Sequence, residues 1–261
     1  MLRRMRIGQI HCAAFSGVGF GQILPLLRVL DLPFLFQNDQ EVDRVHRELR
    51  PFFEEKMKEK GFVLLSWAEV GNVHLFSKVS IQKVADLEGL KVWSWSGDPI
   101  AKETFTAMGV NPIPLAVTDV TTALNTGMID TVYAPPLGAL ALQWQTYVNY
   151  MMALPLVHST GALLIASNYF NKLPKDLADL LKDCTKKVMG DLTKKLREQN
   201  LDALNVLQDS GITITPAPEG KTLERFHEVG DRVARKLSGE VYPEALLNQV
   251  YDILDRTRHS E

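Results

Sequence analysis

The chain has few of the features that fix a function from composition alone. Its 261 residues include two cysteines, Cys12 and Cys184, which form neither a disulfide framework nor a metal-binding spacing. No apolar run reaches the roughly 20 residues that a membrane-spanning helix needs. The formal net charge of −2 does not favour nucleic acid or an anionic membrane as a partner. These absences indicate an ordinary globular protein, and nothing in the sequence calls for a metal or a cofactor.

Motifs of catalysis are missing as well. The sequence contains no P-loop, G-x-S-x-G, H-E-x-x-H or C-x-x-C motif. Gly17 and Gly19 follow a predicted strand, but the third glycine of a dinucleotide-binding fingerprint does not fall where that fingerprint requires it. Asp43 and His46 lie three residues apart on a predicted helix without a third metal ligand nearby. We therefore expect a binding protein rather than an enzyme.

The stretch 87–144 carries the clearest pattern of secondary structure. Apolar strands are predicted at 90–95, 113–117 and 129–134, each followed by a helix of about ten residues. The helix starts are marked by Asp98, Thr118 and Leu137. Strands that alternate with helices predict a parallel sheet covered on both faces, which binds ligands at the carboxyl ends of its strands.

The flanking elements complete an α/β chain. We predict a strand at 5–15 followed by a glycine-rich turn, a helix at 40–59, strands at 61–70 and 72–77, and helices at 219–238 and 243–256. A long amphipathic helix from 173 to about 210 would span about 50 Å. Its apolar residues are expected in the core, at Leu177, Leu181, Cys184, Val188, Leu192 and Leu196.

Positive charge is absent from a long central part of the chain. No Lys or Arg lies between Lys102 and Lys172, and the predicted strand ends carry Trp93, Trp95 and Tyr133. A binding site formed there would be aromatic and would contain no cation from this region. Either tryptophan could instead pack beneath the helices, because alternate strand residues face opposite sides.

Several segments resemble the solute-binding subunits of TRAP transporters, the DctP-like superfamily. They are A-D-L-E-G-L-K-V-W at 85–93, Gly97-x-Pro99, F-T-A-M-G-V-N-P-I-P-L at 105–115, T-T-A-L at 121–124, T-G-M-I-D at 126–130, V-L-D-L-P-F-L-F at 29–36 and N-K-L-P at 171–174. The resemblance implies a two-lobed periplasmic-binding-protein fold of the second topological type, with a long helix crossing the lobes. Such proteins capture a small organic anion and deliver it to a sodium-coupled membrane permease.

The resemblance also suggests lobe boundaries. Lobe I is expected at 1–78 plus 159–211, and lobe II at 79–158 plus 212–261. Compared with the family, lobe I is incomplete at its N-terminus, where the secretion signal and about two strand–helix units precede the matching segment. An incomplete lobe I would expose a sheet edge, so we expect a tendency to form homodimers.

Two positions depart from the family pattern. Where the family typically has an arginine that clamps the ligand carboxylate, this chain has Trp93, and where it often has an asparagine before a proline, this chain has Ala134. A carboxylate held by lobe II is therefore disfavoured, because nothing near Trp93 in the sequence replaces the lost charge. We expect a hydrophobic or amphipathic ligand, and a monocarboxylate held from lobe I is left open.

The sequence thus predicts a periplasmic solute-binding subunit of a TRAP transporter that binds its ligand without chemical conversion. The predicted ligand-binding residues are Phe15, Ser16, Trp67, Glu69, Trp93, Trp95, Tyr133 and Pro135. Expected partners are the membrane permease subunits, and the W-S-W-S-G-D-P run at 93–99 resembles the subgroup that works with a tetratricopeptide-repeat protein. The alternative is an enzyme or an intracellular effector-binding domain on the same two-lobed fold.

Overall fold

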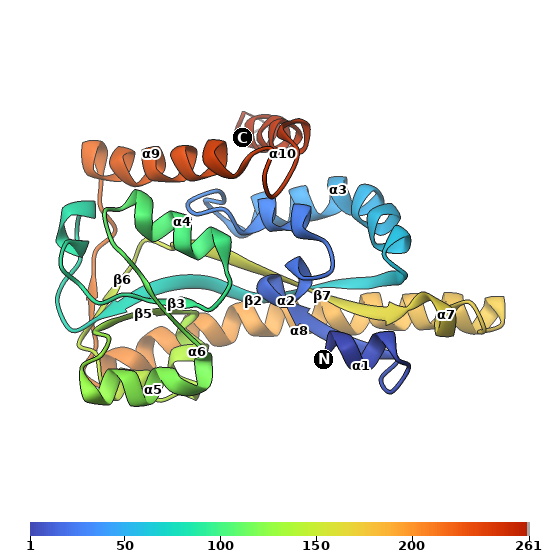
Figure 1. The fold of residues 1–261 in the computed structure, drawn as a ribbon, viewed down its shortest axis with the longest axis horizontal. Coiled ribbons are helices and arrows are strands. Elements are labelled where there is room, and N and C mark those ends of the chain that lie inside the picture. The colour runs from blue at the N-terminus through green and yellow to red at the C-terminus, as the bar shows by residue number, and fades with distance from the viewer. Residues whose placement is uncertain (260–261) are drawn as a thin grey trace.

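Two long antiparallel strands form the spine of the molecule (Figure 1). The computed structural model describes residues 1–259. β2 (Phe62–Ser77) pairs with β7 (Val157–Ala166) through its first two thirds, and its last residues pair with β5 (Thr131–Ala134) and β6 (Tyr150–Met152). β2 therefore connects β7 with β5 and β6 in one sheet.

The main sheet has the strand order β1-β7-β2-β6-β8, with β5 also paired to β2. β1 (Cys12–Ser16) and β8 (Thr213–Thr215) are its end strands. β3 (Trp93–Trp95) and β4 (Ile113–Leu115) form a separate parallel pair, which a parallel bridge from Val92 to Thr131 connects to β5. The three strands of the 87–144 stretch are thus parallel to one another as predicted. The prediction of a purely parallel sheet is wrong, because β5 lies antiparallel to β2.

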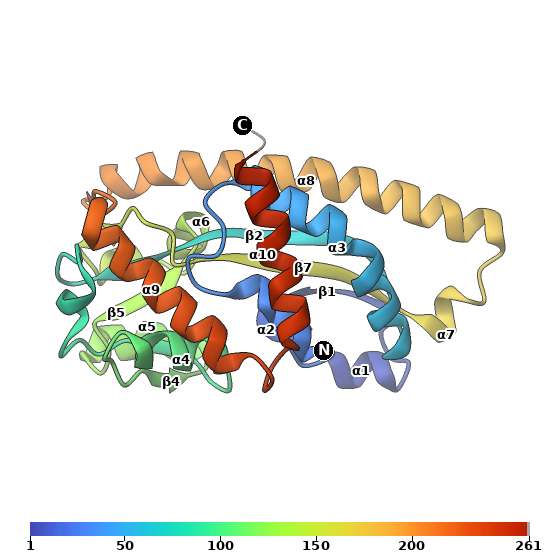
Figure 2. The same cartoon turned by 90° about the horizontal axis from the view of Figure 1, so that it is seen from above.

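Helices cover this framework on several sides (Figures 1 and 2). The α-helices are α1 (Leu2–Arg6), α2 (Gly17–Gly21), α3 (Asp39–Glu59), α4 (Pro99–Ala107), α5 (Val117–Thr126), α6 (Pro136–Ala141), α7 (Ser167–Phe170), α8 (Lys175–Asp209), α9 (Gly220–Leu237) and α10 (Glu244–Arg258). Short 3₁₀ helices are η1 (Pro25–Asp31), η2 (Val84–Leu87) and η3 (Trp144–Thr146). The side chain of Asn38 accepts the Glu41 N–H at the start of α3, as expected of an N-cap.

Four local predictions are wrong. The predicted strand at 5–15 is helix α1 followed by the shorter strand β1, and the predicted glycine-rich turn is helix α2. Thr118 does not cap α5, because that helix begins one residue earlier, at Val117. The predicted strands at 61–70 and 72–77 are one continuous strand, since Gly71 lies at a β-bulge rather than in a turn.

The long helix α8 is present over 35 residues but lies differently from the prediction. It packs against β2 and α6, while its first turns extend beyond the β2–β7 pair in both ribbon views. Leu177 and Val188 are 47% and 63% exposed, and Cys184 is exposed too. The expected core row is therefore mostly on the surface, because the helix meets the sheet along a different line of side chains that includes Thr185, Ala203 and Leu207.

Candidate ligand-binding cavity

A cavity of about 240 Å³ lies where β3 and β5 end and where β1 passes into α2. Residues of the 16–33 segment form one side, and residues of α4, β5 and α6 form the other. The cavity is also lined by three valines of the long strands, Val70 and Val73 of β2 and Val157 of β7. The cavity thus lies between segments that the sequence analysis assigned to different lobes, at the strand ends where an α/β fold is expected to bind its ligand.

Aromatic rings make up much of one wall. Trp93 stacks on Tyr133 with ring centroids 4.9 Å apart, and Trp95 and Trp144 approach Trp93 at 5.3 and 5.4 Å. The polar atoms of the Trp93 and Tyr133 side chains are already bonded within the protein: the indole N–H of Trp93 donates to the Leu115 carbonyl at 3.1 Å, and the Tyr133 hydroxyl accepts the backbone N–H of Trp95 at 3.1 Å. The wall therefore presents mainly carbon surface to a ligand.

Arg28 supplies the charge that the sequence analysis did not find. Its guanidinium is buried in the cavity wall, where Nη1 donates to Asp31 at 2.6 Å and Nη2 donates to Asp98 at 2.7 Å. Asp98 also accepts the N–H of Ile100 as the N-cap of α4, and Asp31 accepts the N–H of Thr160. No Lys or Arg of the 87–144 stretch lines the cavity, and Arg28 brings its cation from the segment 1–78, the expected lobe I.

The electrostatics of this cluster follow from its burial. Burial raises the pKa of Asp31 to about 6, and the opposing effects of Arg28 and the Thr160 N–H do not cancel it. Burial lowers the pKa of Arg28, but the charges of Asp31 and Asp98 outweigh burial and hold it above its ordinary value. Burial together with Asp98 raises the pKa of Tyr133, so its hydroxyl stays neutral. Above pH 6 the cluster holds one cation and two anions.

One clue to Arg28 is visible in the sequence. Arg28 and Asp31 are the only charged residues of the apolar run 23–36, and they are three residues apart. A charge inside an apolar run needs a buried partner or a surface position, and a pair at this spacing meets on one face of a helical turn. The third partner, Asp98, is 70 residues away and could not be found from spacing.

Five of the eight predicted site residues line the cavity: Ser16, Trp93, Trp95, Tyr133 and Pro135. The structure does not bring the other three, Phe15, Trp67 and Glu69, into the cavity wall described for residues 1–259. Phe15 precedes Ser16 on β1, so its side chain points to the opposite face of the sheet. Trp67 stacks on His46 at 4.7 Å and donates to the His46 carbonyl, and it packs against α3.

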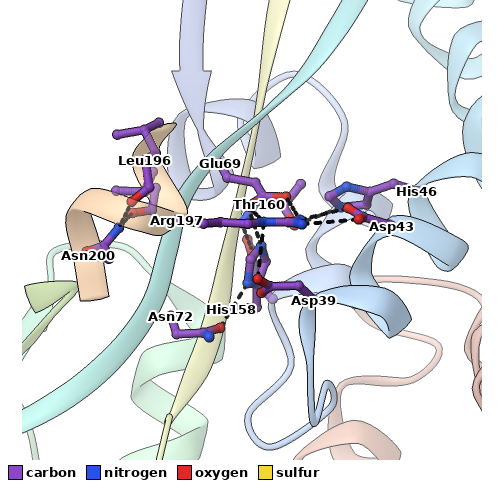
Figure 3. A network of polar contacts seen from close by, with 12 residues as sticks. Asp39, Asp43, His46, Glu69, Asn72, His158, Thr160, Leu196, Arg197 and Asn200 are labelled. Atoms are coloured by element: carbon purple, nitrogen blue, oxygen red, sulfur yellow. Dashed lines mark hydrogen bonds and ion pairs between the residues drawn. The ribbon is translucent and has the colours of Figure 1, made fainter. Parts of the chain in front are cut away.

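Glu69 belongs to a polar network on the other side of β2 and β7 (Figure 3). It accepts two hydrogen bonds from Arg197 of α8, which also binds Asp43 of α3. His158 lies beside it, with Nε2 3.8 Å from a Glu69 oxygen and Nδ1 3.0 Å from the Asn72 side chain. This network joins α3, β2, β7 and α8.

Residues 1–259 contain neither a metal-ion site nor a membrane-spanning helix. No group of three or more His, Cys, Asp or Glu side chains there could hold a metal ion. None of the helices in that range combines the length and the apolar character needed to cross a membrane.

A two-lobed fold with a ligand-sized cavity is typical of the class of solute-binding proteins. The family described as bacterial extracellular solute-binding protein, family 7 (DctP), matches residues 1–239, and the chain belongs to that family. This agrees with the predicted family, and it favours a receptor over an enzyme.

Relatives and a solved structure are consistent with this assignment. A solute-binding protein of Verminephrobacter eiseniae is 29% identical over 63% of this chain, which spans half of that relative's length. The 2,3-diketo-L-gulonate-binding periplasmic protein of Escherichia coli is 25% identical over 97% of this chain and 72% of its own. A TRAP periplasmic solute-binding protein of Shewanella oneidensis, solved with bound succinate, has a TM-score of 0.88 at 18% identity, covering 97% of this chain and 83% of that one.

Proposed function

We propose that the protein is the periplasmic receptor of a TRAP-type secondary transporter and captures a small hydrophobic or amphipathic organic ligand. The observation that carries this proposal is the aromatic wall of Trp93, Trp95 and Tyr133, in which the Trp93 indole N–H and the Tyr133 hydroxyl are already bonded to the protein. Burying an apolar ligand against such a wall stabilises the complex by about 25 cal/mol for each Å² removed from water.

The lobe boundaries of the sequence analysis belong to this proposal. With lobe I at 1–78 plus 159–211 and lobe II at 79–158 plus 212–261, the Arg28–Asp98 ion pair bridges the two lobes across the cavity. Ligand capture is then a hinge closure in which ligand contacts on both sides stabilise the closed form. Ser16 and Pro135 lie on opposite sides of the cavity and would contact the ligand from different lobes.

The proposed partners are the membrane permease subunits of the transporter. The 93–99 run, which resembles the subgroup with a tetratricopeptide-repeat partner, forms β3 and the start of α4 beside the cavity. A homodimer is also proposed, because β1 is an end strand of the sheet and can pair with a second copy. Sedimentation analysis of the purified protein would test the dimer directly.

Native mass spectrometry of the purified protein, followed by extraction of the bound molecule, tests the ligand class. We expect an apolar or amphipathic compound with at most one carboxylate. Recovery of a di- or tricarboxylate would contradict the aromatic-cavity argument, because a second carboxylate would be buried against carbon without a cation of its own.

A further inference from the structure

Among the described residues that line this aromatic cavity, Arg28 is the only lysine or arginine. Two carboxylates already bind it, so the wall carries one cation and two anions. A simple anionic ligand would add a third negative charge to this buried cluster, which is unfavourable without another cation. The charge balance of the cavity therefore differs from that of a site built around a free arginine.

The two carboxylates on Arg28 are not equivalent. Asp31 lies on the same 3₁₀ segment as Arg28 and is also fixed by the N–H of Thr160 at 3.2 Å. Asp98 comes from a segment 70 residues away and accepts the N–H of Ile100 at 3.0 Å as the cap of α4. Because Asp98 comes from a different segment, a movement between the two segments opens the Arg28–Asp98 contact and leaves Arg28–Asp31 intact, and Asp98 then keeps its cap hydrogen bond.

We propose that the ligand is a zwitterion with an apolar body, which inserts between Arg28 and Asp98. Its carboxylate binds Arg28 and its ammonium group binds Asp98, so every charge of the opened ion pair keeps a partner. A carboxylate alone leaves Asp98 without its cation, and an amine alone gives Arg28 no replacement for Asp98. This inference rests on the proposed function and narrows it to the amino-acid or betaine class.

The surroundings of Asp98 suit such a ligand. The Asp98 N–H donates to the Trp95 carbonyl at 3.2 Å, so the carboxylate stands close to the aromatic wall. An ammonium group next to an aromatic face is attracted by the ring quadrupole. Apolar parts of the ligand would lie against the carbon surface of Trp95 and Tyr133.

Four probes that differ in charge pattern test the inference by isothermal titration calorimetry. They are L-phenylalanine, 3-phenylpropionate without the ammonium group, 2-phenylethylamine without the carboxylate, and succinate as a dicarboxylate. For the wild-type protein we expect L-phenylalanine to bind at least about tenfold more tightly than either singly charged analogue, a difference of about 1.4 kcal/mol. Succinate is expected not to bind.

Asp98→Asn is the matched variant, because asparagine also serves as an N-cap and preserves the start of α4. We expect this variant to bind L-phenylalanine more weakly and 3-phenylpropionate more tightly than the wild type does. The preference for L-phenylalanine over 3-phenylpropionate should therefore fall about tenfold or more. Asp119→Asn removes one negative charge from an exposed position on α5 and should leave the preference unchanged. Circular dichroism verifies that both variants are folded.

The outcomes separate the two proposals. If the three phenyl compounds bind wild-type protein equally well, or if Asp98→Asn leaves their ratio unchanged, the zwitterion inference is wrong while the aromatic cavity stands. If none of the phenyl compounds binds, or if succinate binds best, the proposed hydrophobic ligand class is wrong as well.

Discussion

Nη2 of Arg197 lies 2.5 Å from Oε1 of Glu69, and Nε of the same guanidinium lies 3.0 Å from Oε2. This two-point contact joins the long helix α8 to the strand that both lobes share. The Glu69 side chain is nearly buried, and burial raises the pKa of its carboxyl although Arg197 opposes that rise. Glu69 therefore serves to hold α8 on the sheet.

Arg197→Met should destabilise the protein by about 3 kcal/mol, because it leaves the Glu69 carboxylate buried without a cation. Urea denaturation measures the loss. Arg225→Met is the control, since Arg225 pairs with Glu228 on the surface and such pairs contribute less than about 1 kcal/mol. If both variants lose the same free energy of unfolding, the Arg197–Glu69 contact stabilises the protein no more than a surface ion pair does.

Gly71→Ala should also destabilise the protein, by about 1–3 kcal/mol. Gly71 has a φ of +109°, and a Cβ there would come within 2.7 Å of Nδ2 of Asn200 on α8. Gly190→Ala provides the contrast: Gly190 lies inside α8 with open space around its added Cβ, so alanine should stabilise the helix by about 1 kcal/mol. If urea denaturation shows that both variants gain or both lose free energy of unfolding, the conclusion that Gly71 has no room for a side chain is wrong.

Trp95→Ala should weaken binding of an apolar probe such as 3-phenylpropionate by about tenfold or more, because it removes ring surface from the cavity wall. Trp67→Phe should leave the affinity unchanged, since Trp67 packs on His46 and is not part of that wall. Calorimetric titration of both variants distinguishes the two tryptophans. A larger effect at Trp67 would place the ligand elsewhere.

Acid should destabilise the folded state through the buried His158. Burial, with a smaller contribution from Arg197, lowers its pKa from 6.5 to about 4. The unfolded chain then binds the proton more readily, so stability is complete above pH 6.5 and is lost as the pH falls toward 4, by about 3 kcal/mol. The charged or titratable groups near the ring include Glu69, Arg197, Asp43 and His46.

His158→Gln isolates this effect from other titrations. Asp31 acts in the opposite direction, because its raised pKa lets the folded state bind a proton more tightly as the pH falls from about 6. Urea denaturation between pH 7 and 4 should therefore show a smaller loss of stability in the variant than in the wild type. Parallel curves would mean that His158 does not titrate differently in the folded state.

The sequence was sufficient where local rules decide the structure. The capped start and apolar periodicity of α3, the Asp98-Pro99 start of α4, and the length of α8 follow from side-chain chemistry within a few residues. Family motifs added the two-lobed fold. The same local rules explain why five of the predicted site residues line one cavity, since they lie at or near strand ends.

The remaining features depend on contacts between distant segments. Gly71 and Asn72 resemble a turn in sequence, but pairing with β7 keeps the strand continuous through a bulge. Leu177 and Val188 have core spacing, yet their exposure is decided by where α8 meets the sheet. The role of Arg28 became visible only when the fold brought Asp98 beside it.

The shared strand β2 has a consequence for folding. Its first residue Phe62 pairs with Ala166 and its last residue Ser77 pairs with Thr131 and Tyr150, so the sheets of both lobes need the same strand and partners far along the chain. Closing such long loops makes folding slow. Neither lobe can complete its sheet by itself, and the two lobes are therefore expected to unfold in a single cooperative transition.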